Sequence, residues 1–332
     1  MKRCVLYYTS WNQDGDADFT QLSTKVTHLL LSFGRFTQET DGKFSIEASD
    51  NLLKYGFTQP EDLYWLEPEY LKWTQYKKFR DENSTSNPLK VLLAFGGATY
   101  GDMWASLDNI ANVEPIAKAI VDILDVEFPV YDREGEEGEF SQVGTVKLDG
   151  VDFDYEQDGR PSTTQMNNLG LLINRIKEAK PDAVVSLTGY HVSADPESCS
   201  ITAGPDCSFV GSSHCGELLP LLMNIKLLAK LDFYNLMAYD AGRDYPWKIA
   251  MANHAKYLPD EKVTLGLTLG LQWDPEANFV EDMAELQNRI KEEATLPYGG
   301  IMVWAMKADD GSWTTGNEMI AKINELLSVF NN

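Results

Sequence analysis

The chain of 332 residues is short of several residue types, and each shortage excludes a class of protein. It contains no run of about 18 apolar residues, so no transmembrane helix is predicted. Its 28 basic residues are outnumbered by 51 acidic ones, and the net charge of −23 predicts a surface that repels nucleic acid and anionic lipid. We therefore expect no nucleic-acid or membrane partner, and a neutral or cationic substrate. Solubility alone would also explain such a charge.

Cysteine is scarce too, with four residues in the chain. Cys4 stands alone in an apolar run and is expected to be a buried thiol. Cys199, Cys207 and Cys215 fall in one stretch with His214, but their spacing matches no compact zinc pattern, so no metal site is expected. One local disulfide among these three cysteines is the favoured interpretation, and it would indicate an oxidising compartment.

What the sequence does contain is an alternation of short apolar runs with longer amphipathic stretches. Strands are predicted at residues 4–9, 26–33, 91–95, 148–155, 183–187, 233–238, 263–269 and 300–305. Helices are predicted at residues 68–82, 113–126, 162–179, 216–229, 246–257, 275–293 and 315–329, with a weak first helix within 14–25. Such alternation is typical of a parallel sheet with right-handed crossovers. Because no glycine-rich phosphate loop follows the first strand, we predict a closed (β/α)8 TIM barrel rather than an open doubly wound sheet.

Three features bound the domain organisation. Residues 37–67 form a long, aromatic-rich excursion, and residues 128–145, which contain an acidic run, are predicted to be a solvated turn. The seventh and eighth strands are separated by about thirty residues, which leaves room for one helix and no inserted α+β subdomain. We expect a single catalytic domain over residues 1–332, which opens with a strand rather than a signal peptide.

The most informative segment is the predicted fourth strand. Side chains alternate along a strand, so Asp152, Asp154 and Glu156 share one face, with Asp149 out of step. An amphipathic strand with its acids in water would show the same pattern. Inside a parallel barrel, however, the three acids would repel one another and lose solvation, so at least one would hold a proton at neutral pH. Glu156 is nearest the C-terminal mouth, where barrel active sites lie, and is the expected proton donor.

The pattern Asp149-x-x-Asp152-x-Asp154-x-Glu156 resembles the signature of glycoside hydrolase family 18, the chitinases and endo-β-N-acetylglucosaminidases. Three further segments are similar to the family's third, sixth and eighth strands, in that order: residues 90–97 (KVLLAFGG), 233–240 (FYNLMAYD) and 300–305 (GIMVWA). The resemblance covers nearly the whole chain. It implies a retaining glycosidase that needs no cofactor and acts on chitin or N-acetylglucosamine oligosaccharides, an activity class that favours secretion.

The resemblance also implies a role for each carboxylate. The N-acetyl oxygen of the substrate would attack the anomeric carbon and form an oxazolinium ion, so no protein nucleophile is needed. Glu156 would protonate the leaving oxygen and then act as a base toward water. Asp154 would hydrogen-bond the N-acetyl group, and Asp152 would share a proton with Asp154. Tyr7 would reach Asp152, and Asp149 is interpreted as structural.

Further site residues follow from the sixth and eighth strands. Tyr239 would donate to the N-acetyl oxygen, and Asp240 would contact the sugar near the cleavage point. Met237 shares a strand face with Tyr239, and it is either a substrate contact or, more simply, core packing. Trp304 would form an apolar floor beneath the reacting sugar.

The positions of the tryptophans also predict a binding groove, independently of any family resemblance. Six of the eight tryptophans fall at or shortly after the C-terminal ends of predicted strands: Trp11, Trp104, Trp247, Trp273, Trp304 and Trp313. Such a gathering predicts a groove of flat apolar surfaces suited to sugar rings, although loop anchoring is the alternative for any single one. Trp304, Trp104 and Trp273 are the candidates for stacking.

Two further expectations complete the resemblance. Ala94 stands where the family usually has a serine that helps to hold the deepest aspartate, so Asp152 should lack one hydrogen bond and have a raised pKa. Non-proline cis peptides are implied after Ser32, Glu156 and Trp304.

The leading prediction is an endo-acting chitinase with a shallow, open groove. An endo-β-N-acetylglucosaminidase acting on N-glycan cores would share the chemistry, and a non-catalytic chitin-binding barrel would share the fold. Neither the preferred chain length nor the oligomeric state follows from the sequence.

Overall fold

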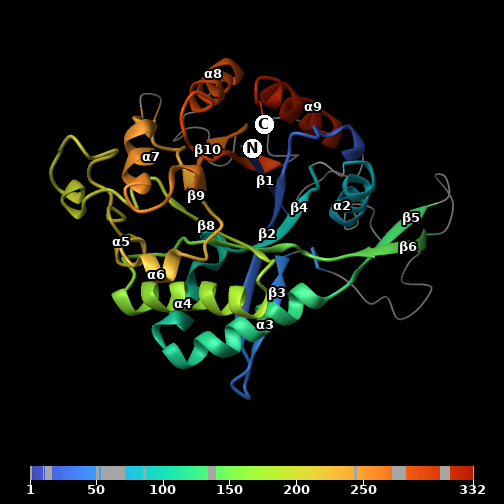
Figure 1. Ribbon diagram of the computed structural model, residues 1–332, viewed down its shortest axis with the longest axis horizontal. Helices are drawn as coiled ribbons and strands as arrows, with labels where there is room; N and C mark the ends of the chain where they lie inside the picture. Colours follow the sequence, from blue (N-terminus) through green and yellow to red (C-terminus); the bar gives the residue numbers. More distant parts are fainter. Residues whose placement is uncertain are drawn as a thin grey trace.

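The structure, a computed structural model, describes residues 2–9, 11, 17–49, 52–53, 72–84, 87–133, 140–242, 245–270, 282–306 and 315–331. Within them a parallel sheet closes into a barrel ringed by helices (Figure 1). Its strands are β1 (Arg3–Thr9), β2 (His28–Gln38), β4 (Lys90–Gly96), β7 (Gly150–Asp154), β8 (Val184–Tyr190), β9 (Phe233–Met237), β10 (Val263–Thr268) and β11 (Gly300–Met306). Each predicted strand is present, and β1 closes the ring by pairing in parallel with both β2 and β11. The predicted (β/α)8 fold is confirmed.

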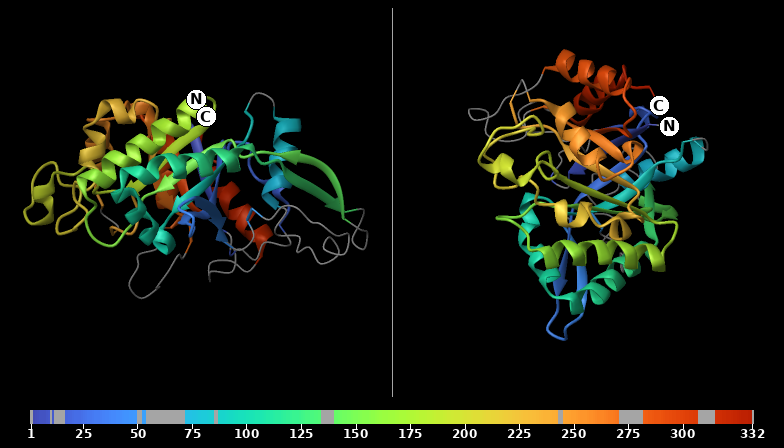
Figure 2. Two further views of the ribbon diagram at one scale, coloured as in Figure 1. Left: turned by 90° about the horizontal axis from the view of Figure 1, so that it is seen from below. Right: turned by 60° about the vertical axis from the view of Figure 1, so that its left-hand side comes forward.

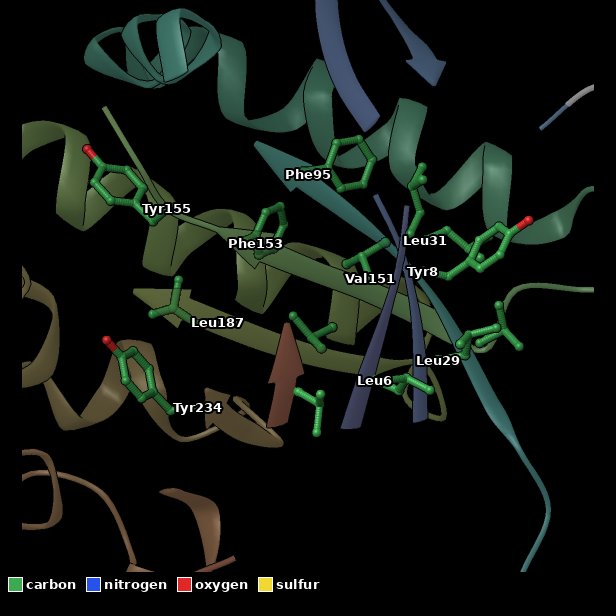
Figure 3. Packing of buried hydrophobic residues seen from close by; sticks show 14 of the residues in the cluster. Leu6, Tyr8, Leu29, Leu31, Phe95, Val151, Phe153, Tyr155, Leu187 and Tyr234 are labelled. Carbon is green, nitrogen blue, oxygen red and sulfur yellow. The ribbon is translucent and has the colours of Figure 1, made fainter. Parts of the chain in front are cut away.

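Alternation along the strands divides the core into two layers. Leu6, Leu29 and Val151 belong to the cluster between the barrel and its helices, part of which Figure 3 shows. Val5 and Leu30, their neighbours in the chain, belong to a second cluster inside the barrel. This alternation decides which face of β7 reaches the interior.

Helices cover the outside of the barrel. They are α2 (Lys72–Asn83), α3 (Val113–Asp125), α4 (Thr163–Ala179), α7 (Trp247–Ala255), α8 (Met283–Glu293) and α9 (Gly316–Leu327). The predicted hydroxyl cap is present at α4, where Ser162 Oγ accepts from the Gln165 N–H. None of the helices in the described ranges is both long and apolar enough to cross a bilayer.

Two predicted helices are wrong. In the described part of residues 14–25 the chain forms only a 3₁₀ helix, Phe19–Gln21. The helix predicted at residues 216–229 is broken into α5 (Leu219–Leu222) and α6 (Ile225–Leu228). Between them Asn224 has φ −97° and ψ 81°, outside the helical region. Asparagine favours such turns because its side chain competes with the helical backbone for hydrogen bonds.

The two excursions contain strands that the sequence analysis did not predict. Residues 128–145 are not a solvated turn, because β5 (Phe128–Arg133) pairs antiparallel with β6 (Phe140–Val146) in a hairpin that projects from the barrel (Figure 1). The hairpin forms because Phe128 is buried against Trp73 of α2, with ring centroids 5.3 Å apart. Residues 134–139, which hold the acidic run, lie outside the described residues. After β2, β3 (Phe44–Ala48) pairs antiparallel with the extended end of that strand.

The connection from β10 to β11 is simple. Its described residues contain the helix α8 and no strand, as expected for a barrel without an inserted subdomain. Residues 271–281 lie outside the described part. The helix α9 follows β11, and the two ends of the chain lie close together in both views of Figure 2.

Candidate active site

The carboxylates of β7 point into the barrel. Val151 and Phe153 pack outward, so Asp152 and Asp154 face the interior, where their exposed fractions are 0% and 3%. Glu156 follows the end of the strand at the C-terminal mouth and is half-buried. Gly150 begins the strand because β8 passes very close, and a Cβ there would lie 1.8 Å from the Val184 carbonyl oxygen. The acids are therefore interior groups and not a solvated strand face.

Asp152, the deepest carboxylate, accepts hydrogen bonds from three hydroxyls. Tyr7 Oη lies 2.8 Å from Oδ2, and Ser186 Oγ lies 2.6 Å from Oδ1. Thr188 Oγ1 lies 3.1 Å from each oxygen. Burial raises the pKa of Asp152 to about 6, and the hydroxyl donors oppose that rise.

The raised pKa expected for Asp152 beside Ala94 is present, although three hydroxyls still donate to this carboxylate. In the barrel register Ala94 of β4 pairs with Asp152, and Asp152 pairs with Ser186 of β8. The hydroxyl missing on one side is therefore supplied from the other neighbouring strand.

Asp154 is buried but incompletely bonded. Its Oδ1 has no hydrogen-bond partner, and burial together with the charges of Glu156 and Asp152 raises its pKa well above the ordinary value. Both oxygens of Asp152 accept from hydroxyls, and a hydrogen bond from Tyr7 opposes the rise in the pKa of Asp154. The predicted sharing of a proton between Asp152 and Asp154 stays a prediction.

Glu156 sits where two cavities meet. One, of about 220 Å³, lies on the Asp154 side, and the other, of about 440 Å³, opens toward Asp102 and Asp158. Burial raises the pKa of Glu156, while hydrogen bonds from the Tyr190 hydroxyl and the Ala98 N–H lower it. A carboxyl that is easily protonated and reachable from both sides can pass a proton to a bound group.

The smaller cavity has an aromatic wall. Trp304 stacks on Phe33, with ring centroids 5.7 Å apart and planes at 21°, and packs edge-on against Tyr7 at 5.3 Å. Trp11 extends this wall, with its ring centroid 6.4 Å from that of Trp304. Flat apolar surfaces beside carboxyl groups suit the faces and hydroxyls of a sugar ring.

The end of β9 closes the cavity from the other side. Met237, Tyr239 and Asp240 all line it together with Asp154 and Glu156. Burial and the neighbouring carboxylates raise the pKa of Tyr239 well above its usual value, so its hydroxyl stays protonated. Asp240 adopts a left-handed backbone conformation, with φ 59°, which is uncommon for a residue other than glycine.

With this geometry in place, comparison with known proteins is decisive. Residues 3–258, more than half of the chain, match the family described as Glycosyl hydrolases family 18. The chain belongs to glycoside hydrolase family 18. The resemblance drawn from the strand motifs is confirmed.

Solved structures similar to this family 18 chain share its fold at low identity. They include a family 18 N-acetylglucosaminidase from Paenibacillus barengoltzii, with 14% identity, a TM-score of 0.58, and coverage of 99% of this chain and 100% of that one. A chitinase from Bacteroides thetaiotaomicron has 13% identity, a TM-score of 0.56, and coverage of 98% and 97%. A fungal endo-β-N-acetylglucosaminidase has 15% identity, a TM-score of 0.54, and coverage of 100% and 99%. A search of curated proteins found no match.

Among the tryptophans of this family 18 barrel, the prediction for Trp104 is wrong. Its side chain is 0% exposed and packs against Tyr155, with ring centroids 4.8 Å apart. The 3₁₀ helix Ala98–Asp108 turns it back over the outer face of β7 instead of toward the mouth. Trp247 is also buried. The predictions for Trp273 and Trp313 lie outside the described residues.

Two of the three implied cis peptides are present, at Ser32–Phe33 and Trp304–Ala305. The bond between Glu156 and Gln157 is not cis, so that expectation is wrong.

The local disulfide joins Cys199 to Cys207, as the clustering of cysteines predicted, and Cys215 is a buried free thiol. His214 pairs instead with Glu217, at 2.7 Å. No group of three His, Cys, Asp or Glu side chains placed to hold a metal ion occurs among the described residues.

Several site residues escaped the sequence analysis. Ser186, Thr188 and Tyr190 lie on the inner face of β8 and contact the acids. Their period of two is legible in residues 184–190 (VVSLTGY), but the strand was predicted to end at residue 187. The pair of His214 and Glu217 gave no periodic signal, because a loop carries it back to the mouth.

Proposed function

We propose that this family 18 chain is an endo-acting chitinase that hydrolyses β-1,4-linked N-acetylglucosamine polymers with retention, by a substrate-assisted route. The observation that carries the proposal is the buried, unpartnered Oδ1 of Asp154 beside Glu156, in the cavity walled by Trp304. An acceptor left unbonded in the interior costs about 1–3 kcal/mol, and more if it is charged. The N–H of a substrate N-acetyl group would satisfy it.

In the first half of the reaction Glu156 donates its proton to the glycosidic oxygen while the bond from that oxygen to the anomeric carbon breaks. The N-acetyl carbonyl oxygen forms a bond to the same carbon, which gives an oxazolinium ion. Asp154 holds the N-acetyl N–H and stabilises the positive charge, and the Tyr239 hydroxyl donates to the N-acetyl oxygen. Trp304 supports the apolar face of the sugar.

In the second half a water molecule attacks the anomeric carbon and gives a proton to the Glu156 carboxylate. The bond between that carbon and the N-acetyl oxygen breaks, which regenerates the acetamido group and the protonated Glu156. Because each bond to the anomeric carbon forms opposite the one that breaks, the two displacements together retain its configuration.

The raised pKa values of Glu156 and Asp154 support this cycle. Interacting carboxyls lose their protons in steps that belong to the pair, so one proton remains bound at a pH where free carboxylic acids are ionised. When that proton passes to the leaving group, the pair of carboxyls becomes more negative by one charge. The added negative charge stabilises the positive oxazolinium ion that forms beside it.

The substrate class agrees with the rest of the molecule. A neutral polysaccharide is not repelled by a chain of net charge −23. The disulfide between Cys199 and Cys207 suits an oxidising environment, so we propose secretion. We further propose that residues 1–332 act as a single catalytic domain.

Hydrolysis of chitin hexamer tests the proposal. The wild type should cut internal bonds, and the first products should carry the β-anomeric form. Glu156→Gln, which keeps the shape but removes the proton, should lower kcat by about 10²- to 10⁴-fold. Glu127→Gln changes an exposed acid that pairs with Lys147, ahead of the start of β7, so it is the matched control and should leave kcat unchanged.

Each other outcome has a definite reading. An initial α-anomer would contradict retention. Cleavage of an N-glycan core but not of chitin hexamer would replace the chitinase by an endo-β-N-acetylglucosaminidase. Binding of the hexamer with no turnover of either substrate would make the chain a chitin-binding barrel.

A further inference from the structure

The long connection from β8 to β9 holds an ion pair to which the reaction above gives no role. His214 Nδ1 lies 2.7 Å from Glu217 Oε2, with the two side chains 24% and 1% exposed. The remaining oxygen of Glu217 is buried without a partner. A carboxylate placed so deeply in the protein costs free energy unless a cation faces it, so the imidazole of His214 is held tightly.

The backbone around the pair is built to fix it. Arg160, from the loop after Glu156, donates to the carbonyl oxygens of Cys215 and Gly216, at 2.9 and 3.2 Å. Gly216 has φ 73°, and a Cβ there would lie 2.9 Å from the Asp195 carbonyl oxygen, so only glycine fits this turn. The turn between His214 and Glu217 is therefore clamped from the loop that carries the catalytic carboxyl.

The pair reaches Glu156 through one aromatic ring. The rings of His214 and Tyr190 pack with centroids 4.4 Å apart. Tyr190 and Glu156 in turn line the same cavity, and hydrogen bonding from the Tyr190 hydroxyl lowers the pKa of Glu156. A continuous set of contacts therefore runs from Glu217 to His214, to Tyr190 and to Glu156.

Charges on every side of His214 act in the same direction. The hydrogen bond from Glu217 raises the pKa of His214, and the carboxyls of Glu217, Glu156 and Asp158 raise it further, against partial burial. On Glu156 the effects are opposite in sign: Glu217 raises its pKa and His214 lowers it. Burial raises the pKa of Glu217, and His214 and Arg160 oppose that rise.

We propose that His214 and Glu217 are positioning residues for Glu156: their ion pair holds the Tyr190 ring so that its hydroxyl remains on the catalytic carboxyl. The proposal rests on Glu156 being the proton donor of the proposed function. These two residues would support the site from behind Tyr190. They come from the connection between β8 and β9, which contains the disulfide, and not from β7. Loss of the pair would loosen Tyr190 and alter how readily Glu156 ionises.

The pH profile of kcat/KM for chitin hexamer separates this role from simple structural support. Glu156 must be protonated to act, so its ionisation sets the alkaline limb. His214→Gln breaks the ion pair and loosens Tyr190, whose hydrogen bond lowers the pKa of Glu156, so it should move that limb to higher pH, by about half a unit or more. Glu217→Gln breaks the same ion pair, so it should move the limb in the same direction. His28→Gln, at the opposite end of the barrel, is the matched control and should not move the limb.

A double-mutant cycle tests the path through Tyr190. In a Tyr190→Phe background the hydroxyl is absent, so His214→Gln should produce less than half of its shift in the wild type. An undiminished shift would mean that His214 acts on Glu156 directly, and would overturn the positioning role. Shifts of opposite sign in His214→Gln and Glu217→Gln would also overturn it, because they would show that each charge acts on Glu156 through space and not through Tyr190.

A measurement without substrate keeps the proposal separate from the proposed function. His214 is one of four histidines in the chain, so its imidazole resonances can be assigned by substitution. Coupling between two titrating groups is reciprocal, so Glu156→Gln should lower the pKa of His214 in an NMR titration. An unchanged His214 titration would refute the link, even if chitin is hydrolysed. A shifted titration in a protein that hydrolyses no glycan would leave the link standing and remove the proposed function.

Discussion

At the scale of single residues, Asp152 shows how a missing group can be replaced from the neighbouring strand. Ala94 offers no hydroxyl, yet Ser186, Thr188 and Tyr7 donate to both carboxylate oxygens. Position 94 and position 186 flank Asp152 in the same register, so either can serve it. The pKa of about 6 follows from burial that these three donors only partly offset.

We expect Ser186→Ala to raise the pKa of Asp152 further, because the shortest of its hydrogen bonds is lost. A hydrogen bond to a charged group contributes about 1.5–3 kcal/mol, so the free energy of unfolding at pH 8 should fall by that amount. Denaturant unfolding at pH 8 measures it. Ala94→Ser in the Ser186→Ala background should restore most of the loss. Failure of Ala94→Ser to restore stability would show that the two positions are not equivalent.

The sign of the pH dependence can be stated for the same group. The pKa of Asp152 in the folded chain is about 6, above the ordinary aspartate value of about 3.9. Between these values the folded state holds the proton and the unfolded state has lost it. The contribution of Asp152 to stability therefore falls as pH rises from about 4 to about 6, and is constant above that range. In Ser186→Ala the fall should continue to higher pH.

At the scale of elements, the 3₁₀ helix after β4 determines on which side of the barrel Trp104 lies. Residues 98–108 leave the strand end and fold back, so Trp104 packs between Tyr155 and Phe36 outside the barrel. Gly96 makes the reversal possible, with φ 105° and with Trp104 itself 2.6 Å from where a Cβ would be. A residue just after a strand end is thus not necessarily at the mouth.

Matched substitutions separate the buried tryptophan from the one in the cavity. Trp104→Leu should lower the free energy of unfolding by about 3 kcal/mol, because it leaves a void in the core, and should leave KM for chitin hexamer unchanged. Trp304→Leu should raise KM by about tenfold, because a sugar-stacking surface is lost. Thermal unfolding and steady-state kinetics on both variants provide the measurement. If KM rose in Trp104→Leu and not in Trp304→Leu, Trp104 and not Trp304 would be the tryptophan that contacts the sugar.

At the scale of the whole molecule, the net charge of −23 acts on stability more than on the site. Exposed acids repel one another across the surface, and this repulsion favours expanded states. Many exposed acids nevertheless have basic neighbours, as Asp122 has Lys118 and Glu325 has Lys322. Such pairs contribute little individually, at about 0–1 kcal/mol each. The repulsion among the excess acids therefore dominates the electrostatic contribution of the surface to stability.

We expect added salt to stabilise the protein without changing its activity on a neutral substrate. Raising the ionic strength from about 0.01 M to 0.15 M shortens the screening length from about 30 Å to about 8 Å. Tm should rise by a few degrees, while kcat/KM for chitin hexamer should change by less than about twofold. Scanning calorimetry and kinetics across sodium and potassium chloride check both. A Tm that falls with salt would show that attraction within ion pairs affects stability more than repulsion among the excess acids.

The barrel and its acidic strand were predictable because both depend on local patterns. Alternation along residues 150–154 places Asp152 and Asp154 on one face, and a parallel sheet with helices outside leaves that face only the interior. Hairpins at β3 and β5 were missed because their strands are short and pair only with a local partner. The direction of Trp104 was missed because a single turn of backbone reverses it.

The sequence by itself determined which residues form the strands and which acids share a face, because a period of two in side-chain direction belongs to the strand wherever it lies. Only the tertiary structure decided which hydroxyls hold Asp152, since that depends on the register of β4, β7 and β8. It alone also brought His214 to Tyr190, because a loop closed by a disulfide returns to the mouth along a path that no periodic pattern encodes.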